Sequence, residues 1–185
     1  MSDESGMLRN IVKSEELYKG HILNLRIDTV RFPSGSDKVR EVVVHKAAVA
    51  MLPVNRKGEL LLVRQYRHAV DQDLFEIPAG LVEPGEDKKE AAIRELREET
   101  GFRPGYIEEI ADFYSSPGYC TEVITVYFVS DLTESKLPED DDEYIKVFAF
   151  TPEALGRMIA EGKIKDGKTL MAYYWYMARQ CQRLS

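Results

Sequence analysis

The 185-residue sequence predicts an α+β protein in which a mostly β first part is followed by mixed strands and helices. Two observations predict this class. Residues 22–80 consist of short alternating or β-branched apolar runs separated by turn residues, which is typical of strands. Residues 87–101 then carry the start and stop signals of a helix, and two more helical segments follow residue 151.

The N-terminal residues predict a tail and a small β subdomain. Residues 1–10 are polar and unpatterned, so we expect a flexible tail. Apolar and polar residues alternate over 22–32, which predicts a strand with one buried face. We expect an antiparallel β subdomain over residues 11–46 and the main domain over residues 47–185.

Six further segments are predicted to be strands because they are rich in β-branched and aromatic residues and are bounded by glycine, proline or charged turns. These segments are 40–55, 59–70, 74–80, 106–116, 122–132 and 144–151.

The first predicted helix has a signal at each end. Asp87 can cap its start, with Glu90 three residues later, and Gly101 can end it in a left-handed turn. Its expected buried face contains Ala92, Ile93 and Leu96.

Two helices are predicted near the C-terminus. Thr151 can cap the first, which has Pro152 at its first position and Gly162 at its end. The second begins at about Lys168. Its apolar face predicts packing in the core or in a dimer, and contains Met171, Tyr174, Trp175 and Ala178.

Composition excludes several classes of function. The net charge of −7 and the sequence pI of about 5.1 disfavour nucleic acids and anionic membranes as partners. No signal peptide or membrane-spanning run is recognised, so we expect a cytoplasmic protein with reduced thiols at Cys120 and Cys181. The three histidines lack metal-ligand spacing and receive no catalytic role; they are His21, His45 and His68.

Acidic residues recur at helical spacing within the predicted helix. Glu95 and Glu99 lie on one face with Glu98 beside them, and Arg94 can contact Glu98 one turn away. Three converging carboxylates favour a hard divalent cation such as Mg²⁺, and Mn²⁺ would also fit. The spacing alone leaves a second interpretation, a solvated acidic face balanced by neighbouring lysines and arginines.

The same stretch resembles the Nudix box, whose glycine, glutamate and arginine positions recur at fixed spacing. All nine constrained positions are filled, by Gly80, Glu86, Arg94, Glu95, Leu96, Glu98, Glu99, Gly101 and Phe102. The resemblance implies the Nudix fold, a mixed β-sheet sandwiched between helices (α/β/α). It also implies hydrolysis of a nucleoside diphosphate linked to another group.

The resemblance implies roles for individual residues. Glu95, Glu98 and Glu99 would bind Mg²⁺ together with the backbone carbonyl of Ala79, with Glu98 and Glu99 taking part in catalysis through the ion. Structural support of the box is expected from Gly80, Glu86, Arg94 and Gly101.

Four segments outside the box resemble the ADP-ribose pyrophosphatase branch of the family; they are RQYRHAV, FEIPAG, SPGYCTE and GKIKDGKT. In the first two, Arg67 is expected to bind phosphate oxygens, and Arg64 either does the same or forms a surface ion pair. Glu76 is expected to accept from an adenine amino group, unless it is simply an exposed strand residue.

Other parts of the chain supply further expected substrate contacts. Pro117 and Gly118 would shape a loop that presents backbone groups, and Glu122 resembles a residue that holds the terminal ribose. Arg40 resembles an arginine that reaches the substrate from the N-terminal subdomain.

A general base is expected in the acidic loop that precedes residue 145. The resemblance favours Glu143, with Asp141 as the alternative if the loop register shifts.

The sequence therefore predicts a Mg²⁺-dependent ADP-ribose pyrophosphatase that releases AMP and ribose 5-phosphate and forms a homodimer. Two alternatives stay open: a nucleotide-sugar pyrophosphatase such as a GDP-mannose hydrolase, and a regulator that binds nucleotides without catalysis. Recognition of guanine instead of adenine would distinguish the GDP-mannose hydrolase from the ADP-ribose pyrophosphatase. Loss of a box carboxylate would favour the regulator.

Overall fold

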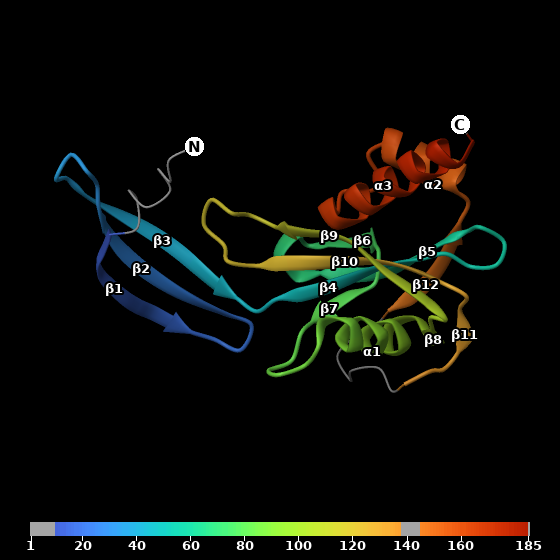
Figure 1. Ribbon diagram of the computed structural model, residues 1–185, viewed down its shortest axis with the longest axis horizontal. Helices are drawn as coiled ribbons and strands as arrows, with labels where there is room; N and C mark the ends of the chain where they lie inside the picture. Colours follow the sequence, from blue (N-terminus) through green and yellow to red (C-terminus); the bar gives the residue numbers. More distant parts are fainter. Residues whose placement is uncertain (1–9, 138–144, 185) are drawn as a thin grey trace. The chain divides into compact units, whose positions relative to one another are not determined.

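The computed structural model describes residues 10–137 and 145–184 (Figure 1). The chain divides into two compact units. As far as it is described, the first unit comprises residues 10–47 and 114–123, and the second comprises the remaining residues.

The first unit is built on a three-stranded antiparallel sheet, which confirms the predicted N-terminal β structure. Its strands are β1 (Asn10–Lys19), β2 (Leu23–Arg31) and β3 (Asp37–His45), in the order β1-β2-β3. The segment 114–123 adds to β3 because Val43 donates to the carbonyl of Tyr119 and accepts from the amide of Thr121, at 2.7 Å and 2.9 Å.

The second unit contains a mixed sheet, an antiparallel sheet and a two-stranded ribbon, with strand orders β7-β4-β10-β9, β12-β5-β6 and β11-β8. Strand β10 runs parallel to β4, whereas β7 runs antiparallel to it. The strands are β4 (Ala48–Pro53), β5 (Leu60–Arg67), β6 (Gln72–Glu76), β7 (Ala79–Leu81), β8 (Phe102–Arg103), β9 (Tyr106–Tyr114), β10 (Val123–Ser130), β11 (Thr133–Glu134) and β12 (Lys146–Phe150).

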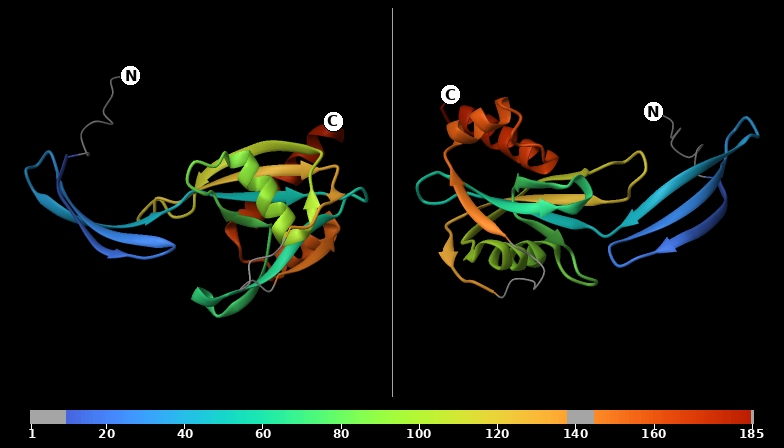
Figure 2. Two further views of the ribbon diagram at one scale, coloured as in Figure 1. Left: turned by 90° about the horizontal axis from the view of Figure 1, so that it is seen from below. Right: turned by 180° about the vertical axis from the view of Figure 1, so that it is seen from behind.

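Helices cover both faces of the mixed sheet (Figures 1 and 2). Strand β4 is buried along its whole length, so its alternate side chains serve two cores. Ala50 and Leu52 pack with residues of α2 (Pro152–Ala160) and α3 (Gly167–Leu184). On the other face, Met51 packs with residues of α1 (Lys88–Thr100). The predicted α+β class, with a mixed sheet between helices, is confirmed.

The capping signals of α1 act as predicted. The Asp87 side chain accepts from the amides of Lys89 and Glu90, at 2.9 Å and 3.3 Å. Gly101 ends the helix with φ 75°, a left-handed conformation in which its amide reaches the carbonyl of Arg97. Both ends of α1 are therefore fixed by contacts between residues that are close in sequence.

Three details differ from the predicted elements. Strand β1 was not predicted from the sequence. The predicted strands over 40–55 and 74–80 are each two strands, β3 with β4 and β6 with β7. In the second case Ile77 and Pro78 interrupt the regular pairing, and the Pro78 carbonyl accepts from the Met51 amide at 2.8 Å.

Within the described residues, every helix is too short or too polar to cross a bilayer. Cys120 and Cys181 are free thiols, as expected.

Candidate active site

Helix α1 places the box carboxylates beside strand β7. Its apolar face, formed by Ala91, Ala92 and Leu96, is buried in the core shared with β4. Glu99 continues this face; it is 6% exposed, and its Oε2 accepts from the backbone amide of Ala79 at 3.1 Å. The start of β7 and the C-terminal half of α1 are therefore joined at a carboxylate.

Gly80 allows the next carboxylate of α1 to approach the strand. A β-carbon at this position would lie 2.0 Å from the carboxyl carbon of Glu95 and 2.2–2.3 Å from its two oxygens. Only glycine leaves that space for the carboxylate. The requirement for glycine in the box thus follows from the position of Glu95.

Arg94 connects the carboxylates of the site to the loop before α1. Its Nε and Nη2 donate to the two oxygens of Glu86, both at 2.9 Å, and Nη2 also donates to the carbonyl of Leu81 at 3.0 Å. Its Nη1 donates to Glu95 at 2.7 Å and to Glu98 at 3.0 Å. These five bonds equal the five N–H donors of a guanidinium. The predicted contact between Arg94 and Glu98 is present.

Arg94 and the carboxylates around it change one another's pKa values. Hydrogen bonds to Glu86 and Glu95 and the charges of these carboxylates raise the pKa of Arg94. The Arg94 hydrogen bond in turn lowers the pKa of Glu86. Glu86, Glu95, Glu98 and Glu99 carry four negative formal charges against one positive charge on Arg94, which leaves −3 over these five residues.

The donor set of α1 suits a hard divalent cation. Carboxylate oxygens are the ligands that Mg²⁺ and Mn²⁺ prefer, and Gly80 leaves a space into which the Glu95 carboxylate already fits. Over residues 10–137 and 145–184, no three His, Cys, Asp or Glu side chains are grouped closely enough to hold an ion. Instead, Arg94 Nη1 bridges Glu95 and Glu98.

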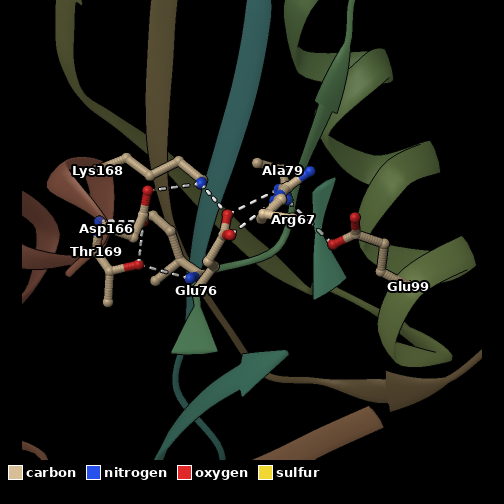
Figure 3. A network of polar contacts seen from close by, with 8 residues as sticks. Arg67, Glu76, Ala79, Glu99, Asp166, Lys168 and Thr169 are labelled. Atoms are coloured by element: carbon tan, nitrogen blue, oxygen red, sulfur yellow. Dashed lines mark hydrogen bonds and ion pairs between the residues drawn. The ribbon is translucent and has the colours of Figure 1, made fainter. Parts of the chain in front are cut away.

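Arg67 and Glu76 lie on the neighbouring strands β5 and β6, and their side chains meet although they are not opposite each other in the register (Figure 3). Arg67 Nε and Nη2 each donate to one Glu76 oxygen, both at 2.7 Å. Hydrogen bonding to Glu76 raises the pKa of Arg67, and the charge of Glu99 adds to this effect. Figure 3 accordingly shows Glu99 of α1 beside Arg67.

Lys168, which the sequence analysis did not single out, also binds Glu76. Its Nζ contacts Glu76 Oε2 and donates to Asp166 Oδ1 at 3.0 Å. Lys168 lies within the GKIKDGKT segment, so the only sequence signal for it was the resemblance of that segment to the family. The expected role of Glu76 toward adenine stays a prediction.

The two other predicted arginines form local contacts. Arg64 pairs with Asp73 at 2.7 Å, with both side chains 47% exposed, which matches the surface ion pair considered for it. Arg40 donates to the carbonyl of Val39 at 2.9 Å, and its guanidinium lies 5.5 Å from the centre of the Phe32 ring. Their roles in substrate binding stay predictions.

The segment 114–123 of the first unit carries three predicted substrate residues. Pro117 and Gly118 lie in a turn in which the amide of Cys120 donates to the carbonyl of Ser116 at 2.9 Å. Glu122 Oε1 lies 3.3 Å from His45 Nδ1. Substrate contacts of this segment stay predictions.

The two candidates for the general base, Glu143 and Asp141, lie outside the described residues.

Comparisons with known proteins agree with this arrangement. The NUDIX domain matches residues 44–173, and the nucleoside diphosphate sugar hydrolase N-terminal domain matches residues 10–43. A crystal structure of an ADP compounds hydrolase superposes with a TM-score of 0.86 at 20% sequence identity, covering 94% of this chain and 95% of that one.

Several proteins of known activity are similar in sequence, and they include the following three. An ADP-ribose pyrophosphatase of Bacillus subtilis and a methanol dehydrogenase activator of Bacillus methanolicus are each 33% identical to this chain, over 91% of it and 92% of their own lengths. An ADP-ribose pyrophosphatase of Mycobacterium tuberculosis is 40% identical over 71% of this chain and 64% of its own length. With both domains matched in order and every box position filled, the chain belongs to the Nudix family, among its nucleoside diphosphate sugar hydrolases.

Proposed function

We propose that the protein hydrolyses the diphosphate bond of ADP-ribose, releasing AMP and ribose 5-phosphate, with Mg²⁺ as cofactor and Mn²⁺ as a possible substitute. One observation carries the proposal: Arg67 lies beside Glu99, one of the carboxylates of α1 (Figure 3). A diphosphate that binds a cation still has oxygens free, and a guanidinium is suited to bind them. A cation site beside an arginine is the arrangement that such a substrate requires.

Four residues would hold the ion: Glu95, Glu98 and Glu99 through their carboxylates, and Ala79 through its carbonyl. When bound, a divalent ion offsets the charge of the diphosphate and makes a water molecule more acidic. Arg94 keeps Glu95 and Glu98 at fixed positions through its Nη1 hydrogen bonds. The amide of Ala79 does the same for Glu99.

Arg67 is proposed to hold one phosphate of the substrate, since 39% of its side chain is exposed and its pair with Glu76 uses only Nε and Nη2. The base that accepts the proton of the attacking water is proposed to be Glu143, with Asp141 as the alternative. Five further residues are proposed to contact other parts of the nucleotide sugar: Arg40, Arg64, Pro117, Gly118 and Glu122.

ADP-ribose is preferred over GDP-mannose as the substrate because an ADP-ribose pyrophosphatase matches 91% of this chain, whereas a GDP-mannose pyrophosphatase at the same 33% identity matches 72% of it. The four segments outside the box also resemble that branch. A substrate panel tests the preference: ADP-ribose, GDP-mannose, diadenosine polyphosphates and NADH are each assayed with Mg²⁺. We expect ADP-ribose to have the highest kcat/KM.

The control for this assay is Glu99→Gln, which keeps an oxygen to accept from the Ala79 amide but removes the charge. It should lose activity on every substrate of the panel while remaining folded. A higher kcat/KM for GDP-mannose would contradict the ADP-ribose assignment. Tight binding of ADP-ribose without turnover by the native protein would instead support a regulator.

A further inference from the structure

The start of α3 is bonded to the end of β6, although the two segments are about 90 residues apart in the sequence (Figure 3). Both lie in segments that the sequence analysis singled out, FEIPAG and GKIKDGKT, without any shared role. Glu76, at the end of β6, binds both Lys168 of α3 and Arg67 of β5. The inference below rests on the proposed function only in that Arg67 holds a substrate phosphate.

Glu76 is the centre of these contacts and faces the protein interior, with only 2% of its surface exposed. Its Oε1 accepts from Arg67, and its Oε2 accepts from both Arg67 and Lys168. Burial alone would raise the pKa of Glu76, but the hydrogen bonds and charges of Arg67 and Lys168 outweigh it and lower the pKa. Glu76 is therefore an ionised anchor with both oxygens in use.

The Arg67 side chain is 39% exposed, whereas that of its partner Glu76 is 2% exposed. Nε and Nη2 are bound to Glu76 in a bidentate pair, which fixes the plane of the guanidinium. Among the described residues, Nη1 has no hydrogen-bond partner. The two N–H groups of Nη1 are the donors that a phosphate oxygen can use.

Lys168 lies in the first turn of α3, and Asp166, which precedes the helix, fixes its side chain. Its side chain is 10% exposed, and Asp166 binds it at 3.0 Å. Asp166 caps the helix by accepting from the Thr169 amide at 2.9 Å and from the Thr169 hydroxyl at 2.5 Å. The same hydroxyl accepts from the Ile77 amide at 2.8 Å. The ammonium group therefore meets Glu76 from a fixed position.

The formal charges of Arg67, Glu76, Lys168 and Asp166 sum to zero. Removing Lys168 would leave Arg67 as the only cation of these four residues against two carboxylates, one of which, Glu76, is 2% exposed. Removing one partner of a buried ion pair lowers stability by more than the pair itself contributes, because the other charge stays buried without compensation. The Glu76 carboxylate would then shift, and the guanidinium bound to it would shift as well.

We propose that Glu76 and Lys168 are positioning residues, which fix the Arg67 guanidinium so that Nη1 meets a diphosphate oxygen of the substrate. On this view Glu76 acts through Arg67 and does not read the adenine base. The start of α3 thereby takes part in substrate binding without touching the substrate.

The test compares Lys168→Met with Lys165→Met. Lys165 stands three residues earlier, is exposed and donates to Gln72 at 2.8 Å, so it is the matched control. We expect Lys168→Met to lower kcat/KM for ADP-ribose by about tenfold to a hundredfold, mainly through KM, as loss of a charge-assisted contact does. Lys165→Met should stay within about twofold of the native protein.

A double-mutant cycle separates positioning of Arg67 from a general structural defect. In an Arg67→Ala background, Lys168→Met should change kcat/KM by less than about twofold, because the side chain on which it acts is gone. Losses that multiply in the double variant would overturn the proposal. If Lys168→Met is not folded by circular dichroism, Lys168→Gln replaces it with the same expectation.

A second pair of substrates tests the role of Glu76. IDP-ribose differs from ADP-ribose at the amino group that an adenine-reading carboxylate would bind. Glu76→Gln should lower kcat/KM for both by the same factor, and a loss confined to ADP-ribose would overturn the proposal. If the native protein prefers a different nucleoside diphosphate sugar, the proposed substrate fails. The Lys168 comparison is then made on the preferred sugar, because Arg67 is argued to hold the diphosphate.

Discussion

Gly80→Ala is expected to damage the active site more than the fold. The new methyl carbon would lie 2.0 Å from the carboxyl carbon of Glu95, where ordinary contact requires about 3.5 Å or more. Gly80 does not have the positive φ that would strain an alanine, so the backbone can stay in place. The Glu95 carboxylate must therefore retreat by roughly 1.5 Å.

That retreat breaks the 2.7 Å bond between Arg94 Nη1 and Glu95. A hydrogen bond between charged groups contributes about 1.5–3 kcal/mol, but Arg94 keeps its bonds to Glu86, Glu98 and Leu81. Alanine also makes the unfolded chain less flexible, which stabilises the folded protein by about 0.4–1 kcal/mol and offsets part of this loss. We expect a net loss of about 1 kcal/mol in the free energy of unfolding, or about 2–4 °C in Tm.

The effect on activity should be larger, because a displacement of about 1 Å in a catalytic site can cost about a hundredfold in rate. The assay measures kcat for ADP-ribose at saturating Mg²⁺, together with a thermal melt. The control is Gly167→Ala, where an added β-carbon meets no atom within 4 Å. A Gly80→Ala protein with kcat within threefold of the native value would refute the reasoning about Glu95.

Three further predictions concern the metal site, pH and assembly. Glu98→Gln should lower kcat by orders of magnitude at an unchanged Tm, measured by steady-state kinetics and melting. Asp112→Asn should destabilise the protein at pH 7, because hydrogen bonds from Thr125 and then Lys88 lower the pKa of Asp112 in the folded state. This contribution is present above the ordinary value of 3.8 and is lost as pH falls through the folded pKa, so denaturant titrations should show the two proteins converging in acid; a constant difference would contradict the assignment. Sedimentation should show a homodimer, since β1 leaves apolar side chains such as Ile11 exposed, and a monomer at working concentration would contradict it.

Local signals explain why α1 was predicted accurately. Its cap and its C-terminal glycine each act within a few residues of a helix end, so both can be recognised in the sequence. The same holds for the contact between Arg94 and Glu98, which follows from helical spacing. The buried face was predicted less well, because Ala91 is buried where Ile93 was expected and Ile93 is half-buried. Strand β1 has no alternation of buried and exposed residues to reveal it, because all of its residues are exposed. Its extended conformation is stabilised by pairing with β2.

Contacts between distant segments could not be predicted. Val43 pairs with residues 119 and 121, and no periodicity of either segment indicates this partner. Glu76 was considered either as a base-reading residue or as an exposed strand residue, and it is buried. Its two cationic partners lie on β5 and at the start of α3, and only the folded chain brings them to it.

The central claim is that the carboxylates of α1 hold a divalent ion against the diphosphate of the substrate. The most direct measurement is a crystal structure with Mn²⁺ and a nonhydrolysable ADP-ribose analogue, with the ion located by anomalous scattering. The account predicts Mn²⁺ within ligand distance of Glu95, Glu98 and Glu99, and the diphosphate between this ion and Arg67. Bound analogue with no ion at these three glutamates would contradict it.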